Sequence, residues 1–362
     1  TLSSSSAASD VYKRQTQGIA TPLLATYIYN LIKRGNKMNK KFYLTVDTET
    51  ATIPFANQIC KNANQKQKIA IAKPLVYDIG WSITDRQGNI VKTENFLVQE
   101  TFFVPNIFNT AYYRDKRPIY MELLKKGEIK VDCWNNIMKL FIADLEKVDI
   151  STAYNACFDF KKAIPFTERY IKALYSSDYQ KWEDRQKKSC EDILNNCNNA
   201  KNEEYLNPYF ELRGVQYPIA DLWCIACERL ININKYRNFC LDRGYVTNSV
   251  VFFKSSAETS FQYLMKNYDF IEDHTALSDA LIESQILTKA LKKGKIEPTL
   301  YAFPFRDLGS TIDYAIDTKQ KYIEPLHELL LNYIENNNGF EKGGAYWKKI
   351  MKELEKLENA NF

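Results

Sequence analysis

Apolar and polar positions in the first quarter of the chain follow the two-residue period of β-strands. The first apolar run, Phe42–Val46, is rich in β-forming residues, and the stretch 75–99 contains two further runs of this kind. Between these two runs lies the segment 85–88, Asp-Arg-Gln-Gly, whose residue types are typical of a hairpin turn. The pattern therefore predicts three consecutive strands, of which the second and third form an antiparallel hairpin.

The middle of the chain is predicted to alternate helices with short strands. Residues 117–147 are predicted to be helical, because apolar positions recur there at three- and four-residue spacing. Strands are predicted at 149–155 and 215–221, each followed by a helix, and Pro165 predicts a kink or an early break in the first of these helices. The polar stretch at about 178–208 is expected to be an inserted, largely exposed helical or loop segment.

The last third of the chain is predicted to be mainly helical. One helix begins near His274 and is stopped by Gly294 and Pro298. Residues 295–362 are predicted to form a C-terminal helical extension, with the strongest helical pattern at 344–360. Three strands followed by strand–helix units predict an α/β fold, in which a mixed sheet carries helices on both faces.

The first 37 residues are expected to be a disordered leader that is not native to the protein. Residues 5–15 can be back-translated into DNA that resembles a sequencing-library adapter, so Met38 is the expected natural start. The alternative is a signal peptide or membrane anchor at 19–32, but this apolar part is too short to span a bilayer and its basic residues follow it. The leader has five basic residues and one acidic residue, so the net charge of +5 falls to +1 without it. Overall charge therefore does not predict a nucleic-acid partner.

Eight cysteines are scattered along the chain without a regular framework, which predicts reduced thiols in a cytoplasmic protein. An alternative is a zinc site formed by Cys190, Cys197, Cys224 and Cys227, because paired thiolates are common zinc ligands. Cys224 and Cys227, however, fall in an apolar helical pattern, where buried thiols are common. We therefore favour structural cysteines over zinc ligands.

Three separated segments place acidic residues next to predicted strands and helices. Asp47 and Glu49 follow the first apolar strand and are expected to point the same way from its end, because residues two apart on a strand share a face. Asp159 opens the helix after the strand 149–155, and His274 precedes Asp279 at the start of a later helix. Each segment also has an ordinary explanation, since about one Asp-x-Glu is expected by chance and acids near a helix N-terminus complement its dipole.

Taken together, these segments give the order Asp-x-Glu, Asp, His-x4-Asp, which resembles the DnaQ-like DEDDh exonuclease superfamily. "VDTET" resembles the first motif of that family, "YNACFD" the second and "HTALSD" the third, while "DIGWSITD" and "IADLWCIACERL" are similar to its flanking segments. The resemblance covers residues 41–290, and 295–362 match no part of the pattern. It implies a ribonuclease H-like domain at 38–294 with a mixed five-stranded sheet.

The resemblance also implies a site for two Mg²⁺ or Mn²⁺ ions, with Asp47 bridging both. The remaining carboxylate ligands would be Glu49, Asp159 and Asp279. His274 would be the general base that accepts a proton from the attacking water. The residues expected to contact the terminal nucleotide are Thr48, Thr50, Ala51, Phe55 and Asn155, although packing of Phe55 in the core is an equally good explanation.

The activity implied by the resemblance is release of 5′-mononucleotides from a free 3′ end of DNA or RNA. One alternative is a catalytically silent module of the same fold that binds nucleic acid or acts as a scaffold. Another is a proofreading subunit that binds a DNA polymerase through residues 295–362. A homodimer is a further expectation, because several members of the family pair through this domain, and no membrane partner is expected.

Overall fold

The computed structural model describes residues 41–59, 71, 73–195, 207–247, 249–300, 305–318, 320–336 and 344–360. The predicted leader 1–37 and the cysteines Cys60 and Cys197 lie outside these residues. Residues 41–362 form one compact unit.

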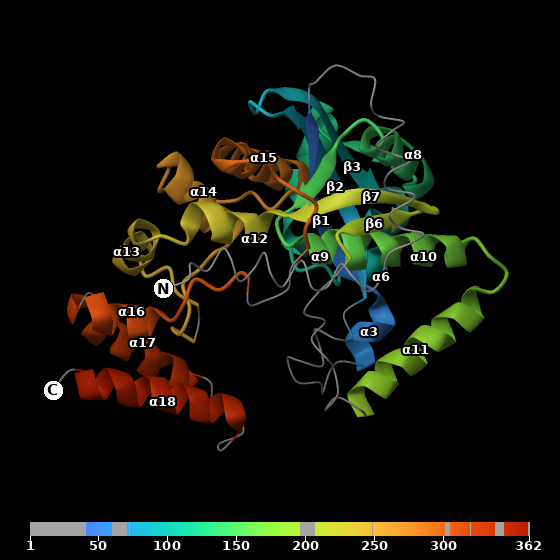
Figure 1. Ribbon diagram of the computed structural model, residues 1–362. Coiled ribbons are helices and arrows are strands. Elements are labelled where there is room, and N and C mark those ends of the chain that lie inside the picture. Colours follow the sequence, from blue (N-terminus) through green and yellow to red (C-terminus); the bar gives the residue numbers. More distant parts are fainter. Residues whose placement is uncertain are drawn as a thin grey trace, which may run out of the picture. The chain divides into compact units, whose positions relative to one another are not determined.

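A mixed sheet of seven strands, in the order β4-β3-β2-β1-β5-β7-β6, lies at the centre of this unit (Figure 1). The strands are β1 (Phe42–Thr52), β2 (Pro74–Asp85), β3 (Ile90–Val98), β4 (Lys130–Asp132), β5 (Ile150–Ala153), β6 (Tyr209–Leu212) and β7 (Val215–Asp221). Strands β1 and β3 each pair in an antiparallel manner with β2, whereas β5 is parallel to β1 and β7 is parallel to β5. The predicted α/β class and the mixed sheet are therefore confirmed.

The prediction of five strands is wrong, because the sheet gains a short strand at each edge. Strand β4 pairs in parallel with β3, and β6 pairs in an antiparallel manner with β7. These strands have only three and four residues. Strands this short are too brief to show an alternation of apolar and polar residues. Lys130–Asp132 also lies between two amphipathic helices, whose periodic pattern hides it.

The same short strand overturns the prediction of one continuous helix at 117–147. The structure has α7 (Arg117–Lys126), then β4, then α8 (Trp134–Leu145). Helix α7 ends at Gly127, which adopts the left-handed conformation with φ 73°. Glycine reaches this conformation without the steric cost of a Cβ atom, so it is a common helix C-terminal residue. In the sequence, Gly127 is therefore the residue that indicates the end of this helix.

The other helical segments can be given together. They are α3 (Pro54–Ile59), α5 (Gln99–Phe102), α6 (Pro105–Phe108), η2 (Arg114–Lys116), α9 (Ala156–Phe158), η3 (Asp159–Ala163), α10 (Ile164–Leu174), α11 (Tyr179–Asn195), α12 (Leu222–Ala226), η5 (Cys227–Ile231), α13 (Asn234–Asp242), α14 (Ala257–Met265), α15 (Ala276–Lys293), α16 (Thr311–Thr318), η6 (Gln320–Tyr322), α17 (Ile323–Asn336) and α18 (Ala345–Ala360). The break predicted from Pro165 is present, because the π-helical turn η3 gives way to α10 with this proline in its first turn.

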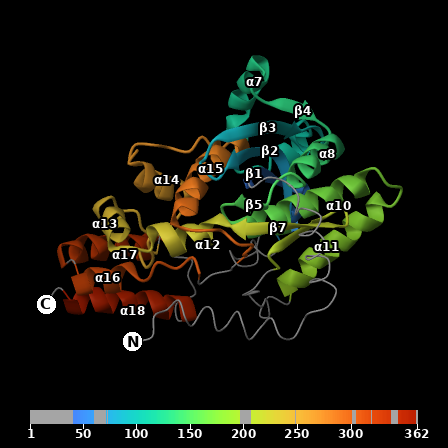
Figure 2. The ribbon, with the colours of Figure 1, turned by 45° about the horizontal axis from the view of Figure 1, so that its top comes forward.

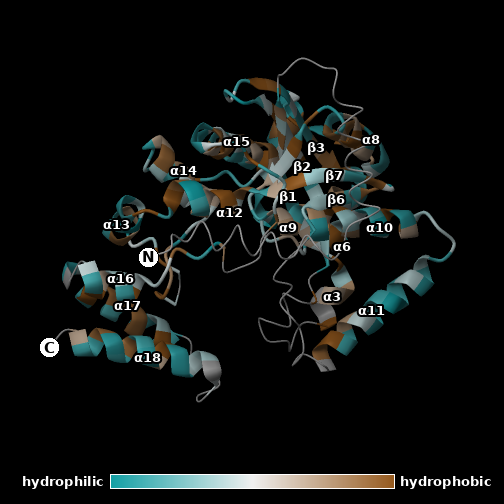
Figure 3. Cartoon of the chain, viewed as in Figure 1, coloured by the Kyte–Doolittle hydropathy of each residue, from teal (hydrophilic) through white to brown (hydrophobic). Residues whose placement is uncertain are grey.

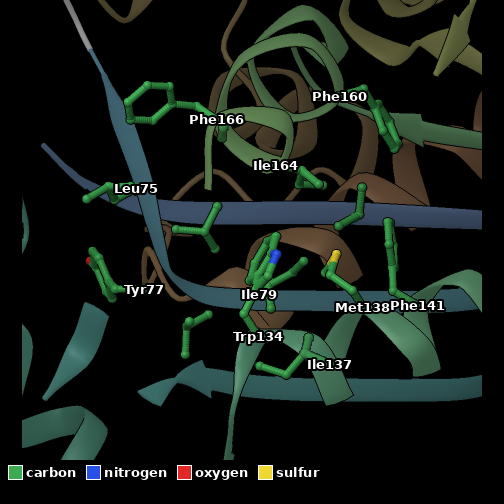
Figure 4. Close-up of a cluster of buried hydrophobic side chains, with 14 of the residues drawn as sticks. Leu75, Tyr77, Ile79, Trp134, Ile137, Met138, Phe141, Phe160, Ile164 and Phe166 are labelled. Carbon is green, nitrogen blue, oxygen red and sulfur yellow. The ribbon is translucent and has the colours of Figure 1, made fainter. Parts of the chain in front are cut away.

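Helices cover both faces of the sheet, as predicted. Helices α8 and α10 pack on one face, where Trp134, Phe141 and Ile164 join Ile79 of β2 in an apolar core (Figure 4). On the other face lies α15, which contacts β1 and β2 and is flanked by α12 and α14. Burial of these aliphatic and aromatic side chains, at about 25 cal/mol per Å², supplies most of the driving force for folding.

The predicted polar insert contains the helix α11, which contacts α3 and α10. Its outer side is exposed, as predicted, but Trp182 packs against Phe166 and Tyr170. Cys190 on the same helix is fully buried. The insert is therefore partly built into the core that lies beside β1.

The three C-terminal helices α16, α17 and α18 lie side by side (Figures 1 and 2). Apolar positions on α18 alternate with hydrophilic ones (Figure 3), and Leu354 and Leu357 are buried among residues of α16 and α17. Ile312 and Ala315 of α16 belong to the same apolar cluster as Leu222 of α12. The C-terminal helices therefore extend the core on the α15 side of the sheet.

No helix in the described part of the chain is long and apolar enough to cross a membrane. Within those same residues the structure shows no disulfide, and six cysteines are present as thiols: Cys133, Cys157, Cys190, Cys224, Cys227 and Cys240.

Gly80 of β2 sets how closely α15 approaches the sheet. A Cβ atom at this position would lie 2.2 Å from the backbone nitrogen of Leu277 and 2.6 Å from the carbonyl carbon of Ala276. Contacts this short with backbone atoms cannot be relieved by a side-chain rotation. The N-terminal turn of α15 therefore depends on the missing side chain of Gly80.

We expect Gly80→Ala to lower the free energy of unfolding by about 3 kcal/mol, because the added methyl group overpacks a rigid contact. Urea titration followed by circular dichroism measures the change. Gly127→Ala is the matched control: nothing lies within 4 Å of its Cβ position, so only the left-handed backbone penalty of about 1 kcal/mol applies. Equal losses in the two variants would contradict the close contact at Gly80.

Candidate functional site

Asp47 and Glu49 lie within strand β1 and not at its end, because β1 continues to Thr52. Asp47 is opposite Gly80 of β2 and Glu49 is opposite Asp78, and the register shifts between Glu49 and Thr50. Such a bulge changes the direction of neighbouring side chains and is common beside functional sites. The prediction that the strand ends at the acids is wrong, since β1 stays paired with β2 beyond the bulge as far as Thr52.

The turn after β5 brings Asp159 next to these acids. Strand β5 pairs with β1 only along Tyr43–Thr45 and then gives way to α9 and η3. Asp159 is the first residue of the π-helical turn η3, and its Oδ1 accepts a 2.6 Å hydrogen bond from the Thr48 hydroxyl. The Thr48 hydroxyl is therefore occupied by Asp159, and only the backbone of Thr48 remains for the predicted contact with a substrate.

His274 and Asp279 lie at the start of α15, where Asp78 fixes the helix end. The backbone N–H of Ala276 donates a 2.9 Å hydrogen bond to Asp78 Oδ2. The N-cap residue Thr275 makes no such bond with its own side chain. A buried carboxylate on β2 thus satisfies one of the N–H groups that a helix leaves unpaired in its first turn. Asp279 belongs to that first turn.

Glu49, His274 and Asp279 form a group able to hold a metal ion, since one ligand atom from each lies within 4.8 Å of the other two. His274 Nδ1 is 3.8 Å from Asp279 Oδ2 and 3.7 Å from Glu272 Oε2. Asp279 Oδ1 is buried without a hydrogen-bond partner among the described residues. These donors suit a hard divalent cation, which prefers carboxylate oxygen and tolerates imidazole.

The imidazole of His274 is held on one side by an aromatic ring. It stacks on Tyr113 with ring centroids 4.5 Å apart and an angle of 12° between the planes. Lys116, three residues further on, donates a hydrogen bond to the backbone carbonyl of Asp273. His274 itself adopts a left-handed backbone with φ 49°, which is uncommon for a residue with a side chain. The segment 113–116 therefore helps to fix both the ring and the backbone of His274.

Burial raises the pKa values of the clustered carboxyl groups. The pKa of Glu49 rises to about 9 through burial and the charge of Asp78, and that of Asp279 rises to about 8 through burial and Glu272. Burial likewise raises the pKa of Asp159 to about 7, against the lowering effect of its bond from Thr48. The pKa of Asp47 is well above its usual range because of burial and the charges of Asp159 and Glu283. Without a cation, these groups cannot all be ionised cheaply at neutral pH.

The pKa of His274 is lowered, first by burial and then by the nearby ammonium group of Lys116. A lowered pKa keeps the imidazole neutral at neutral pH. A neutral imidazole can accept a proton, which an imidazolium cannot. The electrostatic surroundings of His274 therefore suit a general base.

The structure brings the five predicted catalytic residues to one region, but not into one metal-binding group. Within the described residues, only Glu49, His274 and Asp279 meet the spacing of a metal site. Asp47 and Asp159 lie close enough for the charge of Asp159 to raise the pKa of Asp47. One group that could hold a single ion is present among the described residues, and both ions stay predictions.

The predicted nucleotide contacts have different surroundings. Phe55 is 7% exposed in the apolar core and lies beneath Lys187 of α11, at 5.7 Å from the ammonium nitrogen to the ring centroid. Ala51 is also buried, whereas Thr50 is half-buried. Asn155 follows β5 by two residues and adopts the left-handed conformation, with φ 78°. Because Phe55 is buried in the apolar core, core packing explains this residue better than a substrate contact does.

Three residues of the site were missed in the sequence. Asp78 interrupts the apolar run of β2, and a lone acid in such a run is a signal for a buried carboxylate with a specific partner. Glu283 follows Asp279 by four residues, which places both on one face of α15, and its Oε2 accepts a 3.0 Å bond from the Tyr154 N–H. For Tyr113 no local pattern indicated a contact with His274.

The cysteine alternative gains no support from the described residues. Cys224 and Cys227 are buried on α12 and η5, and burial raises the pKa of each thiol to about 12. Zinc binds the thiolate form, which such surroundings disfavour. The fourth proposed ligand, Cys197, lies outside the described residues.

In metal-free buffer, we expect Asp159→Asn to be more stable than the wild type at pH 8, by a few kcal/mol, and equally stable near pH 4. The folded carboxyl group holds its proton up to about pH 7, whereas the unfolded one loses it near pH 4, so wild-type stability falls as the pH rises between these values. Asparagine resembles the protonated acid and avoids this loss. Urea unfolding at several pH values measures the difference between the two proteins.

Addition of Mn²⁺ at pH 8 should stabilise the wild type more than Asp159→Asn, because the ion offsets the repulsion between ionised acids. Asp192→Asn, on the exposed side of α11, serves as the control and should show neither effect. A stability difference between wild type and Asp159→Asn that does not change from pH 4 to pH 8 would contradict the assigned burial of this charge.

Comparison with known proteins does not assign the chain to a family. No protein-family model matches it, and neither a curated protein nor a solved structure gives a significant match. A functional conclusion therefore depends on the positions and chemistry of the side chains themselves.

Proposed function

We propose that this protein is a metal-dependent 3′→5′ exonuclease with a ribonuclease H-like core of the DnaQ-like DEDDh type. The observation that carries the proposal is the meeting of Glu49 from β1 with His274 and Asp279 from the start of α15. Asp47 and Asp159 lie beside this group and complete the set of four acids and one histidine. The strand order β3-β2-β1-β5-β7 within the larger sheet is compatible with the same core.

The acids supply the oxygen ligands that hydrolysis of a phosphodiester needs. When bound, Mg²⁺ or Mn²⁺ ions would stabilise negative charge on the attacking and leaving oxygens. Asp47, Glu49, Asp159 and Asp279 would hold them, and Asp279 Oδ1 still lacks a hydrogen-bond partner among the described residues. The raised pKa values of these acids favour the same role, because a divalent cation converts a repulsive cluster into a neutralised one.

His274 would accept the proton of the attacking water. Its lowered pKa keeps it neutral, and the stack on Tyr113 limits rotation of its ring. A base whose position and protonation state are both set beforehand contributes about 10²–10⁴-fold to the rate. The leaving group would be the 3′ oxygen of the preceding nucleotide, so the product would be a 5′-mononucleotide.

The surface beside His274 suits an unpaired 3′ end. Tyr112 is 86% exposed and contacts Tyr113 edge-to-face, with ring centroids 4.9 Å apart. An exposed aromatic ring next to the stacked pair Tyr113–His274 can stack on a nucleobase without sequence preference. The backbone of Thr48–Ala51 and the side chain of Asn155 would contact the terminal nucleotide, whereas Phe55 is buried and is left out of this set.

Asp47→Asn and Asp159→Asn should each reduce trimming of 3′-ended oligonucleotides by on the order of 10³-fold, because each removes a charge that holds the cations. Labelled single- and double-stranded DNA and RNA, tested with Mg²⁺, Mn²⁺ or a chelator, give the rates and the substrate preference. Asp192→Asn should retain wild-type activity. Full activity in either site variant would exclude the proposed mechanism, and binding without any trimming by the wild type would favour the silent module.

Replacement of His274 by Ala should lower kcat by about 10²–10⁴-fold, because no other group is then placed to accept the proton. The affinity for single-stranded oligonucleotide, measured by fluorescence anisotropy in Ca²⁺, should change little. The wild-type rate should fall at acidic pH as His274 is protonated, at a pH below the usual histidine pKa of about 6.5, and this fall should be lost in the variant. An unchanged pH profile would rule out His274 as the base.

A further inference from the structure

Arg306, in the C-terminal part of the chain between α15 and α16, binds residues at the ends of β5 and β7 beside the candidate site. Its side chain is only 10% exposed, although it carries a full positive charge. Nη2 donates a hydrogen bond to the carboxylate of Asp221, and Nη1 donates a 2.9 Å hydrogen bond to Asn155 Oδ1. The guanidinium also lies over the ring of Trp223, 4.3 Å from its centroid. A buried cation with three oriented partners is a built arrangement and not an incidental surface contact.

The two polar partners of Arg306 stand at the ends of neighbouring parallel strands. Asp221 is the last residue of β7 and pairs with Ala153, the last residue of β5. Asp221 also accepts a 3.1 Å bond from the Cys224 N–H and so caps α12. Asn155 follows β5 by two residues in its left-handed conformation. Arg306 therefore joins two strand ends at the edge of the sheet where Asp159 lies.

The turn at Asn155 determines where Asp159 is placed. Only α9 separates the two residues, and the N–H of Phe158 donates a 2.7 Å hydrogen bond to the Asn155 carbonyl. A left-handed residue with a side chain costs free energy and persists only where its surroundings fix it. Among the described residues, Arg306 is the hydrogen-bond partner that holds the Asn155 side chain.

A second path from Arg306 reaches the same turn through stacked rings. Trp223, beneath the guanidinium, stacks on Tyr154 with centroids 6.0 Å apart and 17° between the planes. The Tyr154 hydroxyl donates a 2.5 Å hydrogen bond to the Ser255 carbonyl, and the backbone N–H of Tyr154 donates one to Glu283 of α15. Arg306 therefore acts on both Tyr154 and Asn155, the two residues that lead from β5 into α9.

We propose that Arg306 is a positioning residue for the Asp159 carboxylate, which it orients by holding the left-handed turn at Asn155. The inference rests on the proposed exonuclease function and extends it to a residue outside the resemblance to the DEDDh pattern. Under this proposal the segment after α15 contributes a positioning residue to the site. Among the described residues, Arg306 forms no hydrogen bond or ion pair with Asp47, Glu49, Asp159 or Asp279, so it acts on them through the turn at Asn155.

Arg306→Ala should lower kcat for oligonucleotide trimming and weaken Mn²⁺ binding, each by about 10–100-fold, as expected when a residue that orients a metal ligand is lost. KM should change less than kcat, because Arg306 is not among the residues proposed to contact the substrate. Arg306→Lys should restore the charge beside Asp221 and the thermal stability but not kcat, because an ammonium group cannot reproduce the planar fork that binds Asp221 and Asn155 together.

A double-mutant cycle with Asn155→Gly tests the route of the effect. Glycine keeps the left-handed backbone but removes the amide that Arg306 binds. Asn155→Gly alone should lower kcat, and adding Arg306→Ala should lower it further by clearly less than the 10–100-fold that Arg306→Ala causes alone. Effects that multiply fully would overturn the proposal, because Arg306 would then not act through Asn155. This cycle also remains informative if Arg306→Ala alone folds poorly, since Arg306→Lys can replace it.

Arg237→Ala is the matched control. Arg237 also holds the C-terminal segment, because its Nε donates a 3.0 Å hydrogen bond to the Leu308 carbonyl. Among the described residues its other hydrogen bonds go to Asn232 and Asn234, and not to Asn155 or Asp221. It should lose stability and keep the wild-type kcat, and an equal loss of kcat would reduce Arg306 to a structural role. Mn²⁺ affinity by calorimetry separates the two hypotheses. A wild type that binds Mn²⁺ but does not trim contradicts the exonuclease, whereas unchanged affinity in Arg306→Ala contradicts the positioning role. A wild type with neither property overturns both.

Discussion

The contact between the start of α15 and strand β2 is the constraint on which the candidate site depends. Gly80 leaves room for the backbone of Ala276 and Leu277, and Asp78 accepts the N–H of Ala276 at 2.9 Å. Because Glu49 is opposite Asp78 in the β1–β2 register, this contact brings the first turn of α15 beside Glu49. His274 and Asp279 are then fixed relative to β1 by backbone geometry, which is far less adjustable than contacts between long side chains.

This arrangement of buried acids lowers the stability of the fold, and chemistry explains it better than packing does. Buried acids with raised pKa values surround one point, and the described residues contribute no salt bridge to Asp47, Glu49 or Asp159. A sheet selected only for stability would place apolar side chains at such positions, as β1 does at Leu44 and Val46. Strained or repulsive groups of this kind are concentrated at functional sites, where the surrounding structure holds them in place. The local instability of the cluster is therefore itself an argument for a bound cation.

The sequence located an element correctly where one local signal dominated. It failed where the feature depends on contacts between residues far apart in the chain. Long periodic segments such as β2, β7 and α15 were located well, because hydrophobic periodicity and the residues that end an element agree there. Edge strands such as Lys130–Asp132 were lost, since three residues carry no period. Asp78 was detectable as an acid in an apolar run, but its partner lies about 200 residues away. For Phe55 the sequence left a substrate contact and core packing equally open, and its burial beneath Lys187 of α11 decides for packing.

The C-terminal segment changes how far the site extends. Without Arg306, the fully buried carboxylate of Asp221 would lose its cation, and breaking a buried ion pair in this way typically costs about 3–5 kcal/mol. Removal of the segment would also expose the cluster that Ile312 and Ala315 share with Leu222. Both effects act at the ends of β5 and β7, the edge that leads to Asp159. Residues 295–362 are therefore better regarded as a part of the domain that supports the site than as a separable tether, and the physical boundary of the domain lies beyond the region in which its sequence resembles the DEDDh pattern.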